Sequence, residues 1–173
     1  MNRMLEESDL ELLQSRNWGS LIGRHYGAVY ALARKLLRSE ADARDAAQET
    51  FARALAKLHS YDARRPLRPW LLSITAHFIR DLLRKRRELP LAPQADLEIA
   101  DVALPSEPLL RQEDGKLLVA ALDRLPFDWK LVVVLHFQQE LAPADIAEAL
   151  GVTTNAVRIR LYRALIALRK DLS

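Results

Sequence analysis

The chain has 173 residues, of which 50% are hydrophobic and 28% are charged. This balance is typical of globular proteins and excludes a wholly disordered chain. The absence of cysteine excludes disulfide frameworks, thiolate metal centres and a cysteine nucleophile. No apolar run approaches the roughly 18 residues that a membrane helix needs, so we expect no membrane insertion. The acidic residues 1–15 also lack the apolar core of a secretory signal.

The net charge of +3 is unevenly distributed along the chain. Residues 16–88 carry a net charge of +9 and residues 115–173 carry +2, whereas residues 1–15 and 89–114 carry −3 and −5. Two basic blocks joined by an acidic link favour a polyanionic partner. A solvated charged surface is the alternative explanation of the same pattern.

Apolar spacings of three and four dominate the first block, which predicts helices. We expect one helix over about 17–38, a second that Ser39 caps, and a third over about 69–87. Two prolines in residues 62–69 predict a loop there. The apolar residues expected in the core are Leu21, Ile22, Val29, Leu32, Ala33, Leu36, Ala46, Ala47, Phe51, Ala54, Leu55, Leu58, Trp70, Leu71, Ile74, Phe78 and Leu82.

Residues 88–107 hold three prolines, scattered acids and no sustained period, and we interpret them as a linker. Pro126 is expected to end the next helix, and residues 127–138 form a further apolar segment. The valines at 132–134 favour a strand, but a lone strand would have no partner, so helix is predicted. The core expected from the helix before Pro126 comprises Leu109, Leu110, Leu117, Leu118, Ala121, Leu122 and Leu125.

The sharpest local pattern begins at Pro143. A short helix is predicted over 143–150, Gly151 supplies the turn, and Thr153 or Thr154 caps a second helix that runs to about residue 170. This is the spacing of a helix-turn-helix, in which small residues allow the two helices to approach closely.

The second helix of this pattern has no acidic residue between Gly151 and Lys170. An acid-free outer face favours DNA, because Arg side chains bind guanine edges and phosphates. An ordinary helical hairpin with a solvated basic face is the alternative. The outward side chains are expected to be Asn155, Arg158, Ile159, Tyr162 and Arg163.

With this motif in place, the chain resembles the extracytoplasmic-function RNA polymerase sigma factors of the sigma-70 family. The matching segments lie in the same order and spacing over about residues 18–172. They are residues 41–54, 69–77 and 84–87 of the first block, and residues 122–126, 144–152 and 156–165 of the second.

The resemblance implies an all-α fold of two small helical domains. A three- to four-helix domain over 16–88 would bind polymerase and melt the promoter, and a helix-turn-helix domain over 108–173 would follow it. The acidic segment 1–15 precedes them, and an acidic flexible linker over 89–107 joins them.

The resemblance also implies a cytoplasmic transcription initiation factor that binds core RNA polymerase at the clamp helices of the largest subunit and at the flap. It would read the −10 promoter element with the first domain and the −35 element with the second. We expect no cofactor, no metal and no catalysis, because the chain has neither ligand-spaced histidines nor a Gly-rich phosphate loop. A two-domain helix-turn-helix repressor or activator that works without core polymerase is the alternative.

By position, the resemblance assigns roles to individual residues. Polymerase binding falls on Asp45, Gln48, Glu49 and Arg53, for which a solvated helix face is the alternative. Contacts to the −10 element fall on Arg64, Arg65, Arg68, His77, Arg80, Arg84 and Lys85. Contacts to the −35 element fall on Thr154, Asn155, Arg158, Ile159, Tyr162 and Arg163.

Ile159, Tyr162 and Ile166 lie at spacings of three and four, on the side of their helix away from the predicted core. An exposed apolar stripe would fit a protein partner such as an anti-sigma factor, and Ile159 would also reach a thymine methyl group. The alternative is that another part of this chain covers the stripe.

Overall fold

The computed structural model describes residues 9–86, 88 and 115–172. The predicted linker and the predictions on Leu109 and Leu110 lie outside these residues. Throughout the described part of the chain, all regular structure is helical and no strand occurs, as the apolar spacing predicted. The chain divides into two units, residues 1–82 and 83–173, and each is considered by itself.

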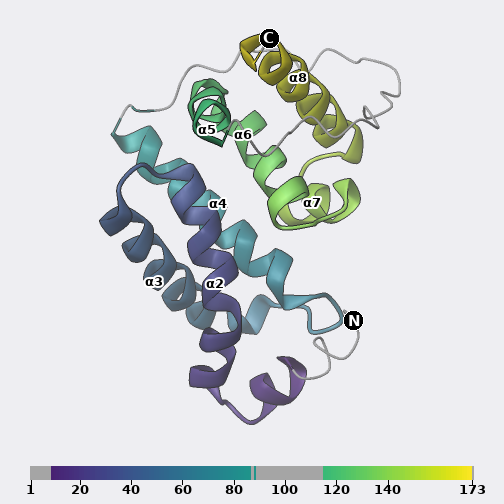
Figure 1. The fold of residues 1–173 in the computed structure, drawn as a ribbon. Coiled ribbons are helices and arrows are strands. Elements are labelled where there is room, and N and C mark those ends of the chain that lie inside the picture. Colours follow the sequence, from purple (N-terminus) through teal and green to yellow (C-terminus); the bar gives the residue numbers. More distant parts are fainter. Residues whose placement is uncertain (1–8, 87, 89–114, 173) are drawn as a thin grey trace. The chain divides into compact units, whose positions relative to one another are not determined.

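Three long helices form most of the first unit (Figure 1). They are α2 (Trp18–Leu36), α3 (Glu40–Ala56) and α4 (Leu67–Lys85), and the 3-10 turn η1 (Leu58–Ser60) follows α3. Helices α2 and α3 pack against each other. The predicted cap at Ser39 is confirmed, because its Oγ accepts a hydrogen bond from the backbone N–H of Asp42 at 3.2 Å.

Helix α4 begins two residues earlier than predicted, at Leu67. The predicted loop over 62–69 is therefore too long, and Pro69 is the third residue of the helix. Proline is tolerated there because the first four N–H groups of a helix have no partner within the helix. Pro66 therefore lies in the loop, whereas Pro69 lies in the first turn of α4.

Most of the core predicted for the first unit is buried, but Leu55 is 42% exposed and that prediction is wrong. Leu55 is the penultimate residue of α3. Apolar spacing identifies one face of a helix, but it does not show how far along that face the neighbouring helix extends. The residues that are only partly buried are Ile22, Leu58, Trp70, Phe78 and Leu82.

A buried polar cluster joins the N-terminal part of this unit to α2. Asp9 is 6% exposed, and its carboxylate lies 2.8 Å from Nη1 of Arg24 and 2.8 Å from Nε2 of His25. Burial lowers the pKa of His25, an effect that Asp9 opposes and that the charges of Arg24 and Arg68 reinforce. The neutral imidazole therefore donates its Nε2 hydrogen to Asp9, and acidification to below about pH 6.5 would oppose folding of this cluster.

Two buried threonines connect α3 to α4. The Oγ1 atoms of Thr50 and Thr75 lie 3.1 Å apart, and both side chains are fully buried. Thr50 Oγ1 also lies 2.8 Å from the carbonyl of Ala46, and Thr75 Oγ1 lies 2.9 Å from that of Leu71. Because these polar atoms are satisfied, the contact fixes the position of α3 along α4 without the penalty of an unpaired buried hydroxyl.

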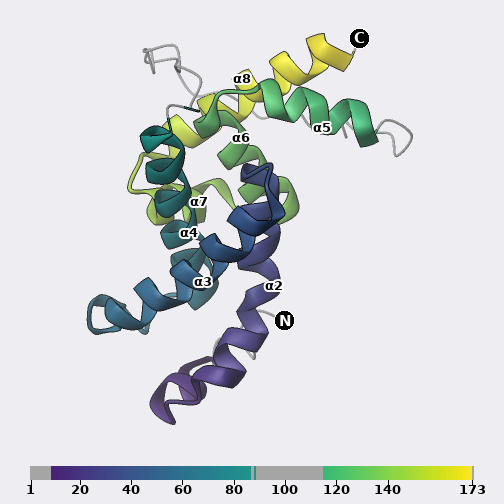
Figure 2. The same cartoon turned by 90° about the vertical axis from the view of Figure 1, so that its left-hand side faces the viewer.

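In the second unit, α8 is the central helix and contacts α5, α6 and α7 (Figure 2). The predicted helix over 127–138 is confirmed, although its second half is a π-helical turn. The predicted core residue Leu117 is wrong, because it lies in the first turn of α5 and is 61% exposed. The elements are α5 (Gly115–Arg124), α6 (Phe127–Val133), η3 (Val134–Gln138), α7 (Pro143–Leu150) and α8 (Thr154–Leu172).

The predicted helix-turn-helix is confirmed at α7 and α8. Gly151 adopts the left-handed conformation with φ 67°, and the N–H of Val152 donates to the carbonyl of Ala147 at 3.0 Å. Thr153 caps α8, since its Oγ1 accepts a hydrogen bond from the N–H of Ala156 at 3.1 Å. The buried side chains between the two helices are Ile146, Ala147, Leu150, Val157 and Leu161.

We expect Gly151→Ala to lower the free energy of unfolding by about 1–2 kcal/mol, because a Cβ disfavours the left-handed conformation. No heavy atom would lie within 4 Å of that Cβ, so the loss would come from the backbone conformation alone. Urea unfolding followed by circular dichroism measures it. The matched control is Gly23→Ala within α2, where the Cβ also meets nothing and should stabilise by about 0.5–1 kcal/mol. Shifts in the same direction for the two variants would contradict this account.

Candidate polymerase and nucleic-acid interfaces

The four residues predicted to bind polymerase lie on one side of α3, at helical spacings of three and four. Asp45 and Gln48 are exposed, while Glu49 and Arg53 are partly buried. Glu49 Oε1 accepts a hydrogen bond from Nε of Arg53 at 2.7 Å. The Arg53 guanidinium lies over the ring of Phe78 from α4, 4.8 Å from its centroid. The exposed side chains of this face are therefore Asp45 and Gln48, whereas the Arg53 cation packs against Phe78 of α4.

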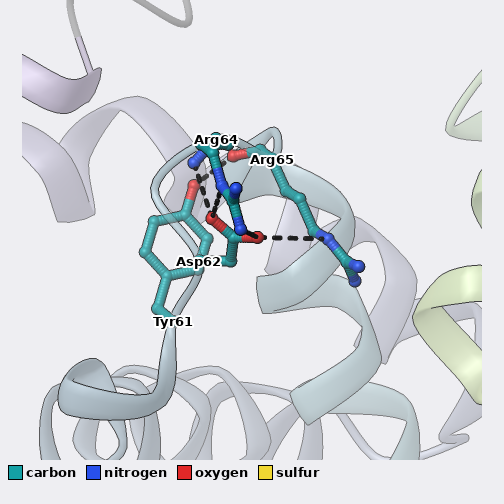
Figure 3. A network of polar contacts seen from close by, with 4 residues as sticks. All are labelled: Tyr61, Asp62, Arg64 and Arg65. Carbon is teal, nitrogen blue, oxygen red and sulfur yellow. Dashed lines mark hydrogen bonds and ion pairs between the residues drawn. The ribbon is translucent and has the colours of Figure 1, made fainter.

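The loop between η1 and α4 carries a network of polar contacts among Tyr61, Asp62, Arg64 and Arg65 (Figure 3). Asp62 Oδ1 lies 3.0 Å from both the backbone N and Nε of Arg64, and Oδ2 lies 3.1 Å from a terminal guanidinium nitrogen. Oδ2 also lies 3.7 Å from Nε of Arg65. The Tyr61 hydroxyl donates to the carbonyl of Arg65. Sequence reasoning identified the arginines but missed Asp62 and Tyr61.

These contacts change the acid–base properties of the loop. Hydrogen bonds from the Arg64 side chain, and then from its backbone N–H, lower the pKa of Asp62 below its usual value. The Arg64 side chain is 90% exposed, whereas that of Asp62 is 35% exposed. The carboxylate is thus ionised at neutral pH and lies closer to the protein than the cation that it binds.

Trp70 was expected to pack in the core, and the structure places it at the edge of the loop. It is partly buried, and its ring centroid lies 4.8 Å from that of Tyr61. The two aromatic rings therefore support the loop from the α4 side. Arg68, three residues after Arg65 in the chain, is partly buried and close enough to influence the pKa of His25.

The remaining predicted −10 residues follow along α4. His77 is exposed, and its Nδ1 lies 2.6 Å from the carbonyl of Ser73. Arg80 is partly buried, whereas Arg84 and Lys85 are exposed in the last turn. Spacings of three and four bring His77, Arg80 and Arg84 to one side of the helix, so they form a basic strip.

On α8, the structure separates the predicted −35 residues into two groups. Ile159 is 2% exposed, so the prediction of a solvent-exposed stripe is wrong at this residue, while Ile166 is 50% exposed. Val157 on the other side of α8 is also buried, because this helix is covered on more than one side, which apolar spacing alone does not reveal. The residues that keep at least partial exposure are Thr154, Asn155, Arg158, Tyr162 and Arg163.

Among residues 9–86, 88 and 115–172, no group of three His, Asp or Glu side chains is placed to hold a metal ion. In the same ranges, no helix combines the length and the apolar character that crossing a bilayer requires.

Comparison with known proteins matches both units to one family. Residues 21–88 match the family model of sigma-70 region 2, and residues 116–168 match that of sigma-70 region 4. The chain is 30% identical over 149 residues to RNA polymerase sigma factor SigV of Bacillus subtilis, covering 86% of this chain and 87% of that protein. It is 31% identical over 165 residues to ECF RNA polymerase sigma factor SigM of Mycobacterium tuberculosis, and the match covers 92% of this chain and 82% of that protein.

A third relative is longer than this chain. The protein named probable RNA polymerase sigma factor RfaY of Xanthomonas campestris pv. campestris is 33% identical over 160 residues, which are 90% of this chain and 40% of that protein. Among solved structures, CnrH in complex with the cytosolic domain of CnrY is 28% identical with a TM-score of 0.68, covering 99% of this chain and 96% of that one. The sigma factor RpoE of Bartonella quintana, solved with the anti-sigma factor NepR, shares the fold at a TM-score of 0.68 and 23% identity. This match covers 91% of this chain and 97% of that one.

Proposed function

Because the chain belongs to the extracytoplasmic-function sigma factors of the sigma-70 family, we propose how its residues carry out promoter-directed initiation. As a sigma factor, it binds core RNA polymerase and directs it to promoters in the cytoplasm. The observation that carries the proposal is the matching of region 2 and region 4 in order, with the helix-turn-helix of α7 and α8 inside the second match. A repressor that works without polymerase would not need the first match.

In this proposal, the face of α3 binds the clamp helices of core polymerase. Asp45 and Gln48 are exposed there, and the Glu49–Arg53 pair keeps the positive charge against Phe78 and away from the partner. An acidic and amide surface is complementary to a basic one, which gives both orientation and rate of association. The chemistry of RNA synthesis belongs to polymerase, and the chain contributes binding and position.

The loop and the basic strip of α4 would hold the −10 element. Arg64, Arg65 and Arg68 supply the cations for an unstacked strand. The strip of His77, Arg80 and Arg84, together with Lys85 in the last turn of α4, would follow the phosphate backbone beside it. Tyr61 and Trp70 brace this loop, so it offers a defined shape and not merely charge.

The exposed side of α8 would read the −35 element in the major groove. Asn155 and Arg158 lie in its first turns, where a recognition helix approaches base edges, and Tyr162 and Arg163 follow one turn later. Ile159 is left out of this surface because it is buried. Ile166, half exposed beside the same face, would be available to an anti-sigma factor, as relatives of this fold have been solved in complex with such proteins.

We expect Asp45→Lys to weaken binding to core polymerase by about tenfold or more, since like charges facing each other across an interface cost several kcal/mol. Fluorescence titration of labelled protein with core polymerase measures this, and circular dichroism should show unchanged helix content. Asp45 is a cleaner choice than Glu49, whose reversal would also break the pair with Arg53. The matched control is Glu11→Lys, an equal charge change at another exposed residue of the same unit. Equal affinities for wild type and Asp45→Lys would reject this face.

We expect Arg84→Ala to reduce the slope of log affinity against log salt by about one, because each phosphate contact releases about one counterion. The decrease in promoter affinity should be the same on promoters with different −10 sequences. Holoenzyme binding measured by filter retention at several salt concentrations tests both points. Arg34→Ala removes an equal charge from α2 and should leave the slope unchanged. A variant that changes which promoters are chosen would show that Arg84 reads bases.

We expect Arg158→Ala to relax −35 selection at one position, at a cost of about 1–3 kcal/mol in promoter binding. Run-off transcription with core polymerase on templates that carry single −35 substitutions measures the change. The control is Ile166→Glu, which adds a charge at the same helix beyond the reach of the groove and should leave the −35 preference intact. If Arg158→Ala lowers transcription equally from all these templates, its side chain contacts phosphate and not bases.

A further inference from the structure

Asp62 pairs with two of the loop arginines for which a DNA contact is proposed. Its two carboxylate oxygens contact Nε and a terminal nitrogen of Arg64, at 3.0 and 3.1 Å. This is the two-point geometry with which a guanidinium also binds a phosphate. The same carboxylate lies 3.7 Å from Nε of Arg65. A phosphate that approached Arg64 would therefore have to displace an anion already in place.

The Asp62–Arg64 pair is weak enough that a phosphate contact to Arg64 would be weakened but not prevented. Arg64 projects into solvent with its side chain 90% exposed, and exposed ion pairs are worth little because water screens them. The carboxylate is additionally held by the backbone N–H of Arg64, 3.0 Å away, so it stays in position when the guanidinium moves. A phosphate contact that takes Arg64 away from Asp62 therefore loses this pairing, at a small cost in free energy.

The same carboxylate also shapes the loop. Its bond to the Arg64 N–H closes a local turn, and the Tyr61 hydroxyl bonds the Arg65 carbonyl at the other end. The Tyr61 ring rests against Trp70. A loop whose conformation is fixed by these contacts can bind an unstacked base in a defined position. Binding to duplex phosphates requires only cations, which can be mobile.

We propose that Asp62 is a specificity-determining residue that withholds Arg64 from the phosphates of non-promoter duplex DNA. The inference rests on the proposed function, in which this loop contacts promoter DNA. In the promoter complex the Asp62–Arg64 pair is kept, because the loop engages an unstacked base in its preformed shape. On other DNA, binding consists of phosphate contacts alone, and the pair reduces it.

The test is Asp62→Asn, which removes the charge but keeps an Oδ1 acceptor for the Arg64 N–H. Holoenzyme binding is measured on a promoter and on a non-promoter duplex of equal length over a range of salt concentrations. We expect non-promoter affinity to rise about two- to fivefold, the range of an exposed ion pair. Its salt slope should steepen by about one. Promoter affinity should stay within twofold of wild type, so the ratio of promoter affinity to non-promoter affinity falls.

A double variant and a matched control identify the cause. Asp62→Asn combined with Arg64→Ala should lose the gain in non-promoter binding, because the released cation is then absent. Asp171→Asn removes the same charge from another exposed Asp–Arg pair, with Arg124 at 3.0 Å, and should change neither slope nor ratio. Equal gains for Asp62→Asn and Asp171→Asn would overturn the proposal, since the gain would then be an effect of net charge.

The remaining outcomes separate this inference from the function on which it rests. If Arg64→Ala weakens promoter opening but Asp62→Asn leaves non-promoter binding as in wild type, the inference on Asp62 is wrong and the loop assignment stands. An equal gain on both duplexes, or a gain that persists in the double variant, also overturns it. If neither Arg64→Ala nor Arg65→Ala affects any DNA contact, the loop assignment itself fails, and the inference fails with it.

Discussion

The position of α3 along α4 is the constraint on which the surfaces of the first unit depend. It is set by the hydroxyl contact of Thr50 with Thr75 and by the Arg53 guanidinium over Phe78. The proposed polymerase face lies on α3, while the loop arginines and basic strip lie on or beside α4. Because these two contacts join the helices, a displacement of either helix would move one surface relative to the other. The proposed polymerase contact and the proposed contact with the opened strand are therefore geometrically coupled through α3 and α4.

Local signals in the sequence were sufficient where each one had a direct physical cause. Gly151 predicted a left-handed turn because only glycine adopts that conformation without strain, and the structure has it there. Ser39 predicted a helix start because its side chain satisfies an N–H that has no partner within the helix. The helix-turn-helix and its core followed from such signals, and so did most of the first unit.

The sequence was less informative wherever the answer depended on what covers a helix. Leu55 and Leu117 follow the apolar spacing of their helices but are exposed, whereas Ile159 departs from it and is buried. Spacing reports the direction in which a side chain points and not whether a neighbour is present there. The Asp62 network was missed for a related reason, because a contact between residues two apart requires a turn that helical spacing cannot describe.

The cluster around Asp9 has a consequence for where the first folded unit begins. Charge and composition alone set residues 1–15 apart as an acidic N-terminal segment. Yet Asp9 is buried and accepts the hydrogen bond of the buried His25 imidazole. A fragment starting at residue 16 would leave that imidazole without its acceptor, at a cost of about 1–3 kcal/mol. A shortened chain that keeps the buried hydrogen bond between Asp9 and His25 therefore has to retain Asp9.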